Sequence, residues 1–391
     1  MKRCALVAAL ATAFPVAAQL PSVMPAGSYV MDRWYPKVFW SPTEGFTAGG
    51  YFSLVAPLRY SEYDAPPAQR IGVSLNGQAA TSGSRFIRLD AFAPYYWVGW
   101  RLRATVSLER RNRDPFFGVG PDTPYDDANT VNNPRFYQAR RDRTWARLEV
   151  QRNVAGGLRL LLGAHAERWR LDPLADASVL GQLAQNDPTL PIGVARTDVA
   201  FRGGAVFDTR DNEAMPRRGI LIEAIHTVAD AGTAGDETYD RTLVSARGYL
   251  TLHPQWDVSA RVAAQRMGGT PSLGSLYLID QSDMPINGLG GFQTHRGLAE
   301  HRLLGKDKLW TNLDVHYTAF EIPTLVRVAF VAFVDAGRVF QTEDFRLTTE
   351  GLQLGAGSGV LLTMFRNAVL GLTVAGGPDG LMIHAHTRWA Y

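Results

Sequence analysis

Two pairs of side chains have a spacing that could support metal binding or acid–base chemistry. His165 and Glu167 stand two positions apart, as do His384 and His386, and this spacing places each pair on one face of an extended strand. A structural metal site also needs a third and a fourth ligand, which the sequence alone does not identify. We therefore interpret both pairs as polar residues on one face of a strand, and we expect neither a bound metal nor a cofactor.

A glycine-rich segment is the nearest approach to a nucleophile. Gly355-Ala356-Gly357-Ser358-Gly359 superficially resembles a nucleophile elbow, but its spacing is not Gly-x-Ser-x-Gly. We expect instead a strand whose glycines allow neighbouring segments to pack closely. The sequence also has no Walker-type phosphate loop. The protein is thus expected not to be an enzyme.

Strict alternation of apolar and polar residues is the main structural pattern. Near 95–110, every second residue from Tyr96 to Leu108 is apolar, whereas Arg101 to Glu109 on the other face are polar or charged. Alternation alone would also fit a soluble sandwich, but sandwich strands average about 5–6 residues. Segments of ten or more match the length that a tilted strand needs to cross a bilayer. The pattern predicts an all-β fold, a transmembrane antiparallel β-barrel with one wall facing lipid and the other a lumen.

About 16 strands can be placed along the chain. They lie near 30–40, 46–59, 68–76, 84–93, 95–110, 142–152, 157–170, 198–208, 219–229, 240–252, 256–267, 308–319, 326–337, 352–363, 368–376 and 380–391. An even number puts both chain ends on the periplasmic side, which makes 111–141, 171–197 and 268–307 external loops. Segment 268–307 is too long to be an idle connection, and loops of this length are commonly functional or fold back into the structure.

The first 18 residues are typical of a cleaved secretory signal. Lys2 and Arg3 precede an apolar run that ends in small residues, with cleavage expected before Gln19. Residues 19–391 then form the barrel. The single cysteine, Cys4, lies in the leader, so no disulfide is expected in the exported chain. Without the leader the formal net charge falls from +3 to +1, which does not favour nucleic-acid binding.

These features predict an integral protein of the outer membrane. Outer-membrane lipids and lipopolysaccharide would surround it, and the barrel assembly machinery would insert it. The last predicted strand carries Trp389 and Tyr391 on one face, and a terminal aromatic residue resembles the C-terminal signal of outer-membrane barrels. Most tryptophans, among them Trp169, Trp310 and Trp389, are expected in the aromatic girdles at the membrane surfaces.

Three segments resemble the bacterial surface antigen family, the outer-membrane assembly and secretion barrels of the BamA and TamA type. Phe207 to Asn212, with Pro216 and Gly219, resembles the family's turn motif, of which we single out Asp208, Arg210, Asp211, Asn212 and Gly219. The segment Phe333-Val334-Asp335-Ala336-Gly337 is similar to the family's Phe-x-Asp-x-Gly strand. The third segment, 114–120, resembles a Phe-Phe-Gly-x-Gly motif.

The resemblance implies a loop that plugs the lumen. In that family an Arg-Gly tip on the sixth external loop pairs with the aspartate of the Phe-x-Asp-x-Gly strand, which here implies Arg296 and Gly297 with Asp335. His295 and Leu298 depart from the family's flanking residues. An arginine in a narrow lumen can bind a carboxylate through two parallel hydrogen bonds. The alternative is a solvated Arg296 with Asp335 as a turn residue.

The resemblance also implies a role in outer-membrane biogenesis or transport. Family members that insert or translocate proteins carry periplasmic POTRA domains, whereas only about ten residues of the exported chain precede the first strand here. We therefore expect a barrel without POTRA domains that acts with a separate periplasmic partner. A porin-like passive channel and a structural surface protein remain the alternatives.

Overall fold

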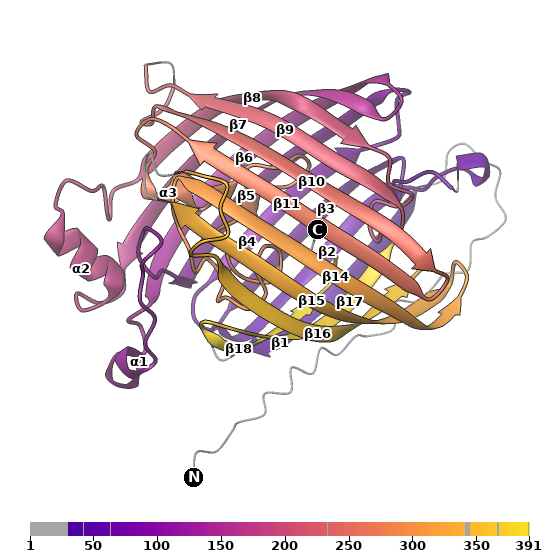
Figure 1. Ribbon diagram of the computed structural model, residues 1–391. Helices are drawn as coiled ribbons and strands as arrows, with labels where there is room; N and C mark the ends of the chain where they lie inside the picture. Colours follow the sequence, from indigo (N-terminus) through magenta and orange to yellow (C-terminus); the bar gives the residue numbers. More distant parts are fainter. Residues whose placement is uncertain are drawn as a thin grey trace, which may run out of the picture.

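A single large antiparallel sheet dominates the computed structural model. The structure describes residues 30–391 except 42, 63, 233, 341–344, 366 and 390, so the predicted signal peptide lies outside the described residues. Sixteen strands pair with their sequence neighbours in order. The sheet curls so that β18 comes round toward β1 (Figure 1). The predicted number and order of strands are confirmed.

The strands of this sheet are long and follow the chain closely. They are β1 (Met31–Ser41), β2 (Gly45–Ala56), β3 (Ile71–Ala80), β4 (Arg85–Ala93), β5 (Trp100–Pro115), β6 (Gln138–Ala155), β7 (Leu158–Pro173), β8 (Arg196–Asp208), β9 (Gly219–Ala229), β10 (Tyr239–His253), β11 (Trp256–Met267), β14 (Asp307–Ile322), β15 (Val326–Phe340), β16 (Gln353–Met364), β17 (Ala368–Gly377) and β18 (Gly380–His386).

Helices occur only as short pieces in the described loops. They are η1 (Tyr60–Glu62), α1 (Ala128–Asn132), α2 (Val179–Asn186) and α3 (Leu273–Leu276). Two strands of two residues each, β12 (Leu278–Ile279) and β13 (Ile286–Asn287), pair with each other in an antiparallel arrangement. Among the described residues, no helix is both long and apolar enough to span a membrane. The long loops with α1, α2 and α3 gather at one end of the barrel, here called the loop end (Figure 1). The opposite end, which has mostly short connections, is called the turn end.

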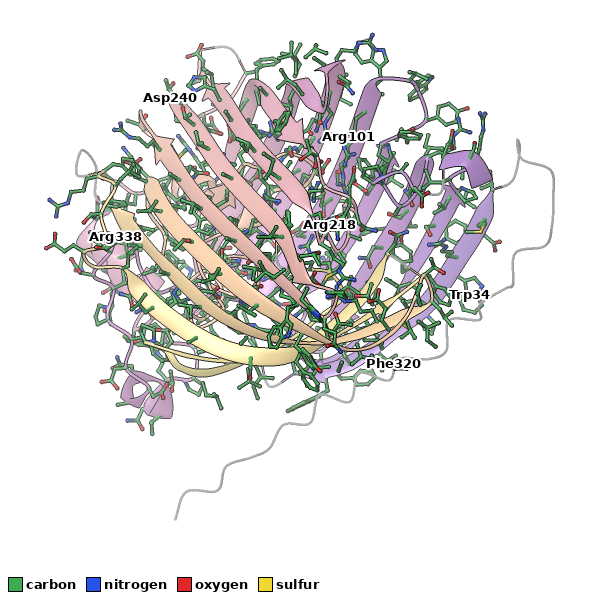
Figure 2. The ribbon with its side chains drawn as sticks, turned by 45° about the vertical axis from the view of Figure 1, so that its right-hand side comes forward. Trp34, Arg101, Arg218, Asp240, Phe320 and Arg338 are labelled. Carbon is green, nitrogen blue, oxygen red and sulfur yellow. The ribbon has the colours of Figure 1, made fainter. Side chains whose placement is uncertain are left out.

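The two faces of the sheet differ as the alternation predicts. On β6, Arg143, Trp145 and Arg147 are buried, whereas the intervening Thr144 and the nearby Leu148 are exposed. Exposed apolar and aromatic residues cover the outer face, and Trp34 and Phe320 lie on this outside (Figure 2). Charged side chains fill the inside, where most form ion pairs. A sheet with an apolar outside and a polar inside is the arrangement of a membrane barrel.

The last predicted strand is wrong beyond His386. β18 ends there, and the terminal residues Trp389 and Tyr391 turn into the lumen, where they are 7% and 8% exposed. The Tyr249 hydroxyl donates to the main-chain oxygen of Tyr391 at 3.2 Å, and the Tyr391 hydroxyl donates to the Ser259 carbonyl at 3.2 Å. These bonds hold the aromatic ends inside, so neither residue lies on the lipid-facing wall.

Two more tryptophans are misplaced by the girdle prediction. Trp169 and Trp310 are each 2% exposed and pack into apolar clusters inside the barrel. Trp169 donates its indole N–H to Glu237 at 3.2 Å. The long loops fill the lumen and create apolar surroundings there, which an alternation pattern does not reveal.

The two end strands of the sheet do not pair in the described part of the chain. β1 pairs with β2 along its whole length, and β18 pairs with β17 only from His386 to Gly380. No register joins β1 to β18. Pro36 lies in the middle of β1 and has no N–H, so it cannot donate a hydrogen bond at this point of the edge.

Candidate functional site in the barrel lumen

The loop between β11 and β14 occupies the lumen. This segment, residues 268–306, is called the plug loop. Its apolar residues Leu289, Leu298 and Leu303 are each at most 1% exposed and pack against Trp310 and Val339 of the barrel wall. The loop is therefore an internal part of the fold, as expected for a segment of this length.

Arg296 anchors the tip of the plug loop. Its Nε and Nη2 donate to the two oxygens of Asp335 on β15, at 2.9 and 2.6 Å, which is the two-pronged geometry of a strong arginine–carboxylate pair. The main-chain N–H of Arg296 also donates to Asp335 at 2.7 Å. The structure thus brings together the two residues that the family resemblance pairs.

A second carboxylate completes this site. Asp314 on β14 accepts from Nη1 and Nη2 of Arg296 at 3.1 and 2.5 Å. Both aspartates are fully buried and Arg296 is 2% exposed. The guanidinium carbon lies 3.6 Å from the centre of the Phe333 ring, which places the cation over an aromatic face. Asp314 was not singled out in the sequence, although its polar face was predicted.

Neighbouring polar groups fix the two aspartates and the loop tip. Asn312 donates to Asp335 at 2.7 Å and to the Thr294 carbonyl at 2.9 Å. Arg261 in turn donates to the side-chain oxygen of Asn312 and to the Gln293 carbonyl, both at 2.6 Å. A buried charge that is fully surrounded by hydrogen-bonding partners is held in one geometry.

Gly297 packs directly against two glycines of the wall. A side-chain carbon added at Gly297 would lie 2.8 Å from the α-carbon of Gly355 and 2.8 Å from the Gly376 carbonyl. One added at Gly377 would lie 2.1 Å from the Gly297 carbonyl. The glycines of β16 and β17 therefore admit the loop tip, as predicted for the glycine-rich segment 355–359.

The substitution Gly297→Ala tests this close contact. Because backbone atoms surround the added methyl group, we expect a loss of about 1–3 kcal/mol in the free energy of unfolding. The measurement is urea-induced unfolding in lipid vesicles, followed by the gel mobility of the folded barrel. Gly248→Ala is the control, because open space surrounds Gly248 on β10. Equal losses in the two variants would contradict the close-packing argument.

The four predicted histidine and glutamate positions act in the structure as hydrogen-bonding residues. His384 donates to the Arg296 carbonyl at 2.8 Å and so helps to hold the loop tip. His386 bonds to the Arg388 carbonyl, and His165 lies 3.3 Å from Asp198. Glu167 pairs with Arg143 at 2.5 Å. Within the described residues, no group of three His, Asp or Glu side chains is arranged to hold a metal ion.

A second charged cluster holds the plug loop at residues 280–283. Asp280 accepts from Arg147 at 3.1 Å, from Arg202 at 2.9 Å and from the Thr227 hydroxyl at 2.6 Å. The carbonyl of Gln281 accepts from the same two arginines, at 2.6 and 3.1 Å. These partners come from β6, β8 and β9. This cluster, here called the second anchor, was not predicted from the sequence.

The second anchor extends toward the turn end through Asp283. Arg101 on β5 donates to Asp283 and to Glu213, with shortest distances of 3.1 and 2.7 Å. Glu223 accepts from Arg247 at 2.9 Å and from the main-chain N–H of Ser282 at 3.0 Å. Inward-facing arginines therefore pair with acidic residues, and several of these partners lie in loops.

The acidic residues of the second anchor should make the position of the plug loop depend on pH. Burial is the largest single influence and raises the pKa of Asp280 and Asp283, but the attractions and hydrogen bonds of their neighbours, led by Arg147 and by Arg101 respectively, together outweigh it, so each pKa lies below its ordinary value. A carboxyl group whose pKa is lowered in the folded protein stabilises the fold at pH values above its ordinary pKa of about 4. This stabilisation is lost as the pH falls through the lower pKa of the folded protein. We expect the plug loop to remain in place from neutral pH to about pH 5.

Single-channel current at decreasing pH measures whether the plug loop stays in the lumen. Current should stay low until the solution is strongly acidic, because the aspartates must be protonated before the anchor weakens. Asp283→Asn should move the onset of opening toward higher pH, because it removes one of the carboxylates. A wild-type transition near pH 6 would instead indicate a histidine and would contradict the prediction.

The family-like turn closes part of the turn end. Asp208 and Arg210 form a two-pronged pair, with both bonds at 2.9 Å, and Arg159 adds a third bond to Asp208 at 3.0 Å. Asn212 accepts from the main-chain N–H groups of Ala214 and Met215. Gly219 has φ +102°, a conformation that favours glycine. These contacts give each predicted turn residue a local structural role.

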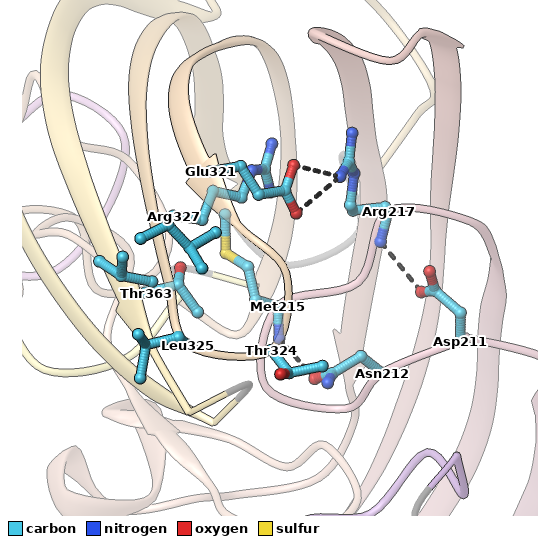
Figure 3. Close-up of a pocket in the computed structure, with 11 residues that line it drawn as sticks. Asp211, Asn212, Met215, Arg217, Glu321, Thr324, Leu325, Arg327 and Thr363 are labelled. Atoms are coloured by element: carbon cyan, nitrogen blue, oxygen red, sulfur yellow. Dashed lines mark hydrogen bonds and ion pairs between the residues drawn. The ribbon is translucent and has the colours of Figure 1, made fainter.

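A small pocket lies between this turn and the β14–β15 connection. It measures about 190 Å³ (Figure 3). Asp211 accepts from the main-chain N–H of Arg217 at 3.0 Å, and Arg217 pairs with Glu321 across the pocket at 3.2 Å. Met215 and Leu325 contribute apolar surface. The pocket thus offers both charged and apolar groups at the turn end.

Gly337, the last of the predicted site residues, lies against the plug loop. A side-chain carbon at Gly337 would lie 3.3 Å from the side chain of Leu289 in the plug loop. Phe333 and Gly337, on either side of Asp335, therefore both face the plug loop. The Phe-x-Asp-x-Gly segment thus offers the plug loop the aromatic ring of Phe333, the carboxylate of Asp335 and, at Gly337, the space left by a missing side chain.

These features define a membrane barrel with a plugged lumen, and comparison with known proteins gives its family. The Omp85 superfamily domain matches residues 68–365, so the chain belongs to the Omp85 superfamily. This assigns an outer-membrane β-barrel. No curated protein matches the sequence.

Solved structures share the fold at low sequence identity. The crystal structure of BamA from Haemophilus ducreyi lacking POTRA domains 1–3 matches with a TM-score of 0.56 and 14% identity over 91% of this chain and 68% of that one. CdiB from Escherichia coli matches with a TM-score of 0.60 and 14% identity over 93% of this chain and 62% of that one. This chain thus spans about two thirds of the length of these structures.

Proposed function

We propose that this Omp85 barrel acts in outer-membrane biogenesis or secretion, in a resting state whose lumen is closed by the plug loop. The observation that carries the proposal is the burial of Arg296 between Asp314 and Asp335. A passive pore has no need of a loop anchored by buried ion pairs at two places. A protein whose lumen must stay closed until it binds a client does need such an anchored loop.

The open edge of the sheet supplies a route for such a client. An unpaired edge strand presents N–H and C=O groups that can pair with another chain. Because β1 and β18 are not joined by a register, the wall could part there with little loss of hydrogen bonding. We propose that this seam, which Pro36 weakens further, opens toward the bilayer during function.

A periplasmic partner would meet the turn end. We propose that a separate periplasmic protein recruits the client. The pocket lined by Asp211, Met215 and Glu321 combines charge and apolar surface there. We propose that the partner contacts this pocket, with the loop end outside the cell.

Conductance of the refolded protein in planar bilayers tests the closed lumen. We expect a low, flickering current from the intact protein and a large, steady current after deletion of residues 285–303. Deletion of residues 126–134, which include helix α1 with no buried residue, shortens another long loop and should leave the current low. A large, steady current in the intact protein would overturn the closed state and favour the porin-like channel.

A cell lacking this protein tests the biogenesis role separately. We expect quantitative proteomics to find one or more outer-membrane or secreted proteins depleted, and the wild-type gene to restore them. A variant with cysteines that join β1 to β18 should fail to restore them until a reductant is added. Unchanged protein levels together with slower solute uptake would contradict the proposal.

A further inference from the structure

A group of arginines lies on the outside of the barrel near the loop end. It is here called the rim patch and consists of Arg85, Arg110, Arg140, Arg168 and Arg170. Each occupies an outward-facing position, because side chains two residues apart on a strand lie on the same face. Ile87, Leu108 and Ala166, which are two residues from Arg85, Arg110 and Arg168 respectively, are exposed on the lipid-facing wall. The patch therefore lies just above the apolar band, at the level of lipid headgroups.

The strand register places these side chains in a row. Arg85 is directly opposite Arg110, Arg110 is opposite Asp142, and Asp142 is opposite Arg170. Arg168 lies two residues from Arg170 along β7, below this row, and Arg140 lies two residues from Asp142 along β6, above it. Side chains directly opposite each other on one face are about 5 Å apart, and like charges in such a pair are destabilising. The sheet alone thus gives no reason to place Arg85 opposite Arg110.

Two aspartates do not balance the five arginines. Arg110 binds Asp142 with bonds of 2.5 and 3.0 Å. Asp172 is shared by Arg140 at 2.7 Å and Arg170 at 2.8 Å. Within the described residues, the side chains of Arg85 and Arg168 form no hydrogen bond or ion pair. The rim patch therefore has a net charge of +3, with two exposed guanidinium groups available to a ligand.

We propose that the rim patch binds the phosphate groups of lipopolysaccharide in the outer leaflet. Phosphate matches the planar fork of arginine, and an anion between Arg85 and Arg110 would relieve their repulsion. A ligand held at this height must also have acyl chains that lie along the apolar wall below, over Ile87 and Leu108. Lipopolysaccharide combines both properties. The proposal rests on the orientation proposed above, with the loop end outside.

Retention of lipopolysaccharide by the full-length protein in detergent tests the proposal. The probe is a deep-rough lipopolysaccharide with phosphorylated lipid A, and bound lipid is quantified after size-exclusion chromatography. The variant is Arg85→Gln with Arg168→Gln. The control, Arg152→Gln with Arg266→Gln, removes the same charge from other exposed outward positions.

The rim-patch variant is expected to bind about thirtyfold more weakly, because each arginine near an anionic membrane surface contributes about a five- to sixfold factor. The control pair should bind like the wild type. Wild-type protein should bind dephosphorylated lipopolysaccharide as weakly as the variant binds the intact lipid, and millimolar inorganic phosphate should not displace the intact lipid.

Three results would overturn the proposal: unchanged retention by the rim-patch variant, equal loss in both pairs, or displacement by inorganic phosphate. Gel mobility of the unheated and heated proteins verifies that both variants fold. The conductance of the rim-patch variant should stay low. An open pore in the wild type would overturn the proposed closed state without altering the retention result, so the two failures are distinguishable.

Discussion

Replacing Arg296 with alanine is expected to lower the free energy of unfolding by about 3–5 kcal/mol. The reason is that Asp314 and Asp335, both fully buried, would then face each other without a cation. Removing one partner of a buried ion pair is costly because the remaining charge stays out of water. Urea-induced unfolding in lipid vesicles, with gel mobility as the readout, measures the loss.

Asp335→Ala is expected to have an effect of similar size, and the double variant should add little to either single change. The two residues share one site, so their contributions are coupled rather than additive. Arg218→Ala is the control, because Arg218 is an exposed arginine with no side-chain ion pair among the described residues, so its loss should change stability by no more than about 0.5 kcal/mol. Simple addition of the two single effects would contradict the anchoring role of this pair.

The second large effect is expected at the second anchor. Asp280→Ala would leave Arg147 and Arg202 with Glu149 as their shared carboxylate and should also cost about 3–5 kcal/mol. Because this anchor shares no partner with Arg296, the losses in Asp280→Ala and Arg296→Ala should add in the double variant. The same unfolding assay measures both.

Conductance should respond differently from stability. A loop held at two places stays in the lumen while one anchor remains, so each single variant should keep a mostly low current. The double variant should show frequent, large openings. Asp230→Ala is the control, since Asp230 is an exposed acidic residue at the loop end, outside both anchors. Large openings in Asp280→Ala alone would mean that the tip contributes little to closure.

The barrel can be predicted from the sequence because one face of each membrane strand contacts lipid and must be apolar, which produces the alternating pattern. The bounds of β9 and β11 coincide with the predicted segments 219–229 and 256–267. On β14, Asn312, Asp314 and His316 alternate with residues of the outer wall and therefore lie on the inward, polar face. Alternation cannot say which loop residue an inward side chain will meet, so the role of Asp314 beside Arg296 was missed.

The second anchor was missed for the same physical reason. Asp280 contacts residues from three strands that lie far from it in the chain, and only the folded loop brings them together. The departures from the family tip are explained by the structure. His295 bonds to the Gln353 carbonyl at 2.9 Å, and Leu298 is 1% exposed among apolar residues of the plug loop and wall.

The position of Tyr391 has a consequence for the order of assembly. Its ring lies inside the barrel, 4.6 Å from the Arg261 guanidinium carbon, and its main-chain oxygen accepts a hydrogen bond from Tyr249. If the terminal aromatic residue is the address read during insertion, it must be read while the last strand is still unfolded, because the finished barrel conceals it. An affinity tag fused after Tyr391 would have to be accommodated in that filled lumen, so a tag placed ahead of β1 is the safer choice for purification.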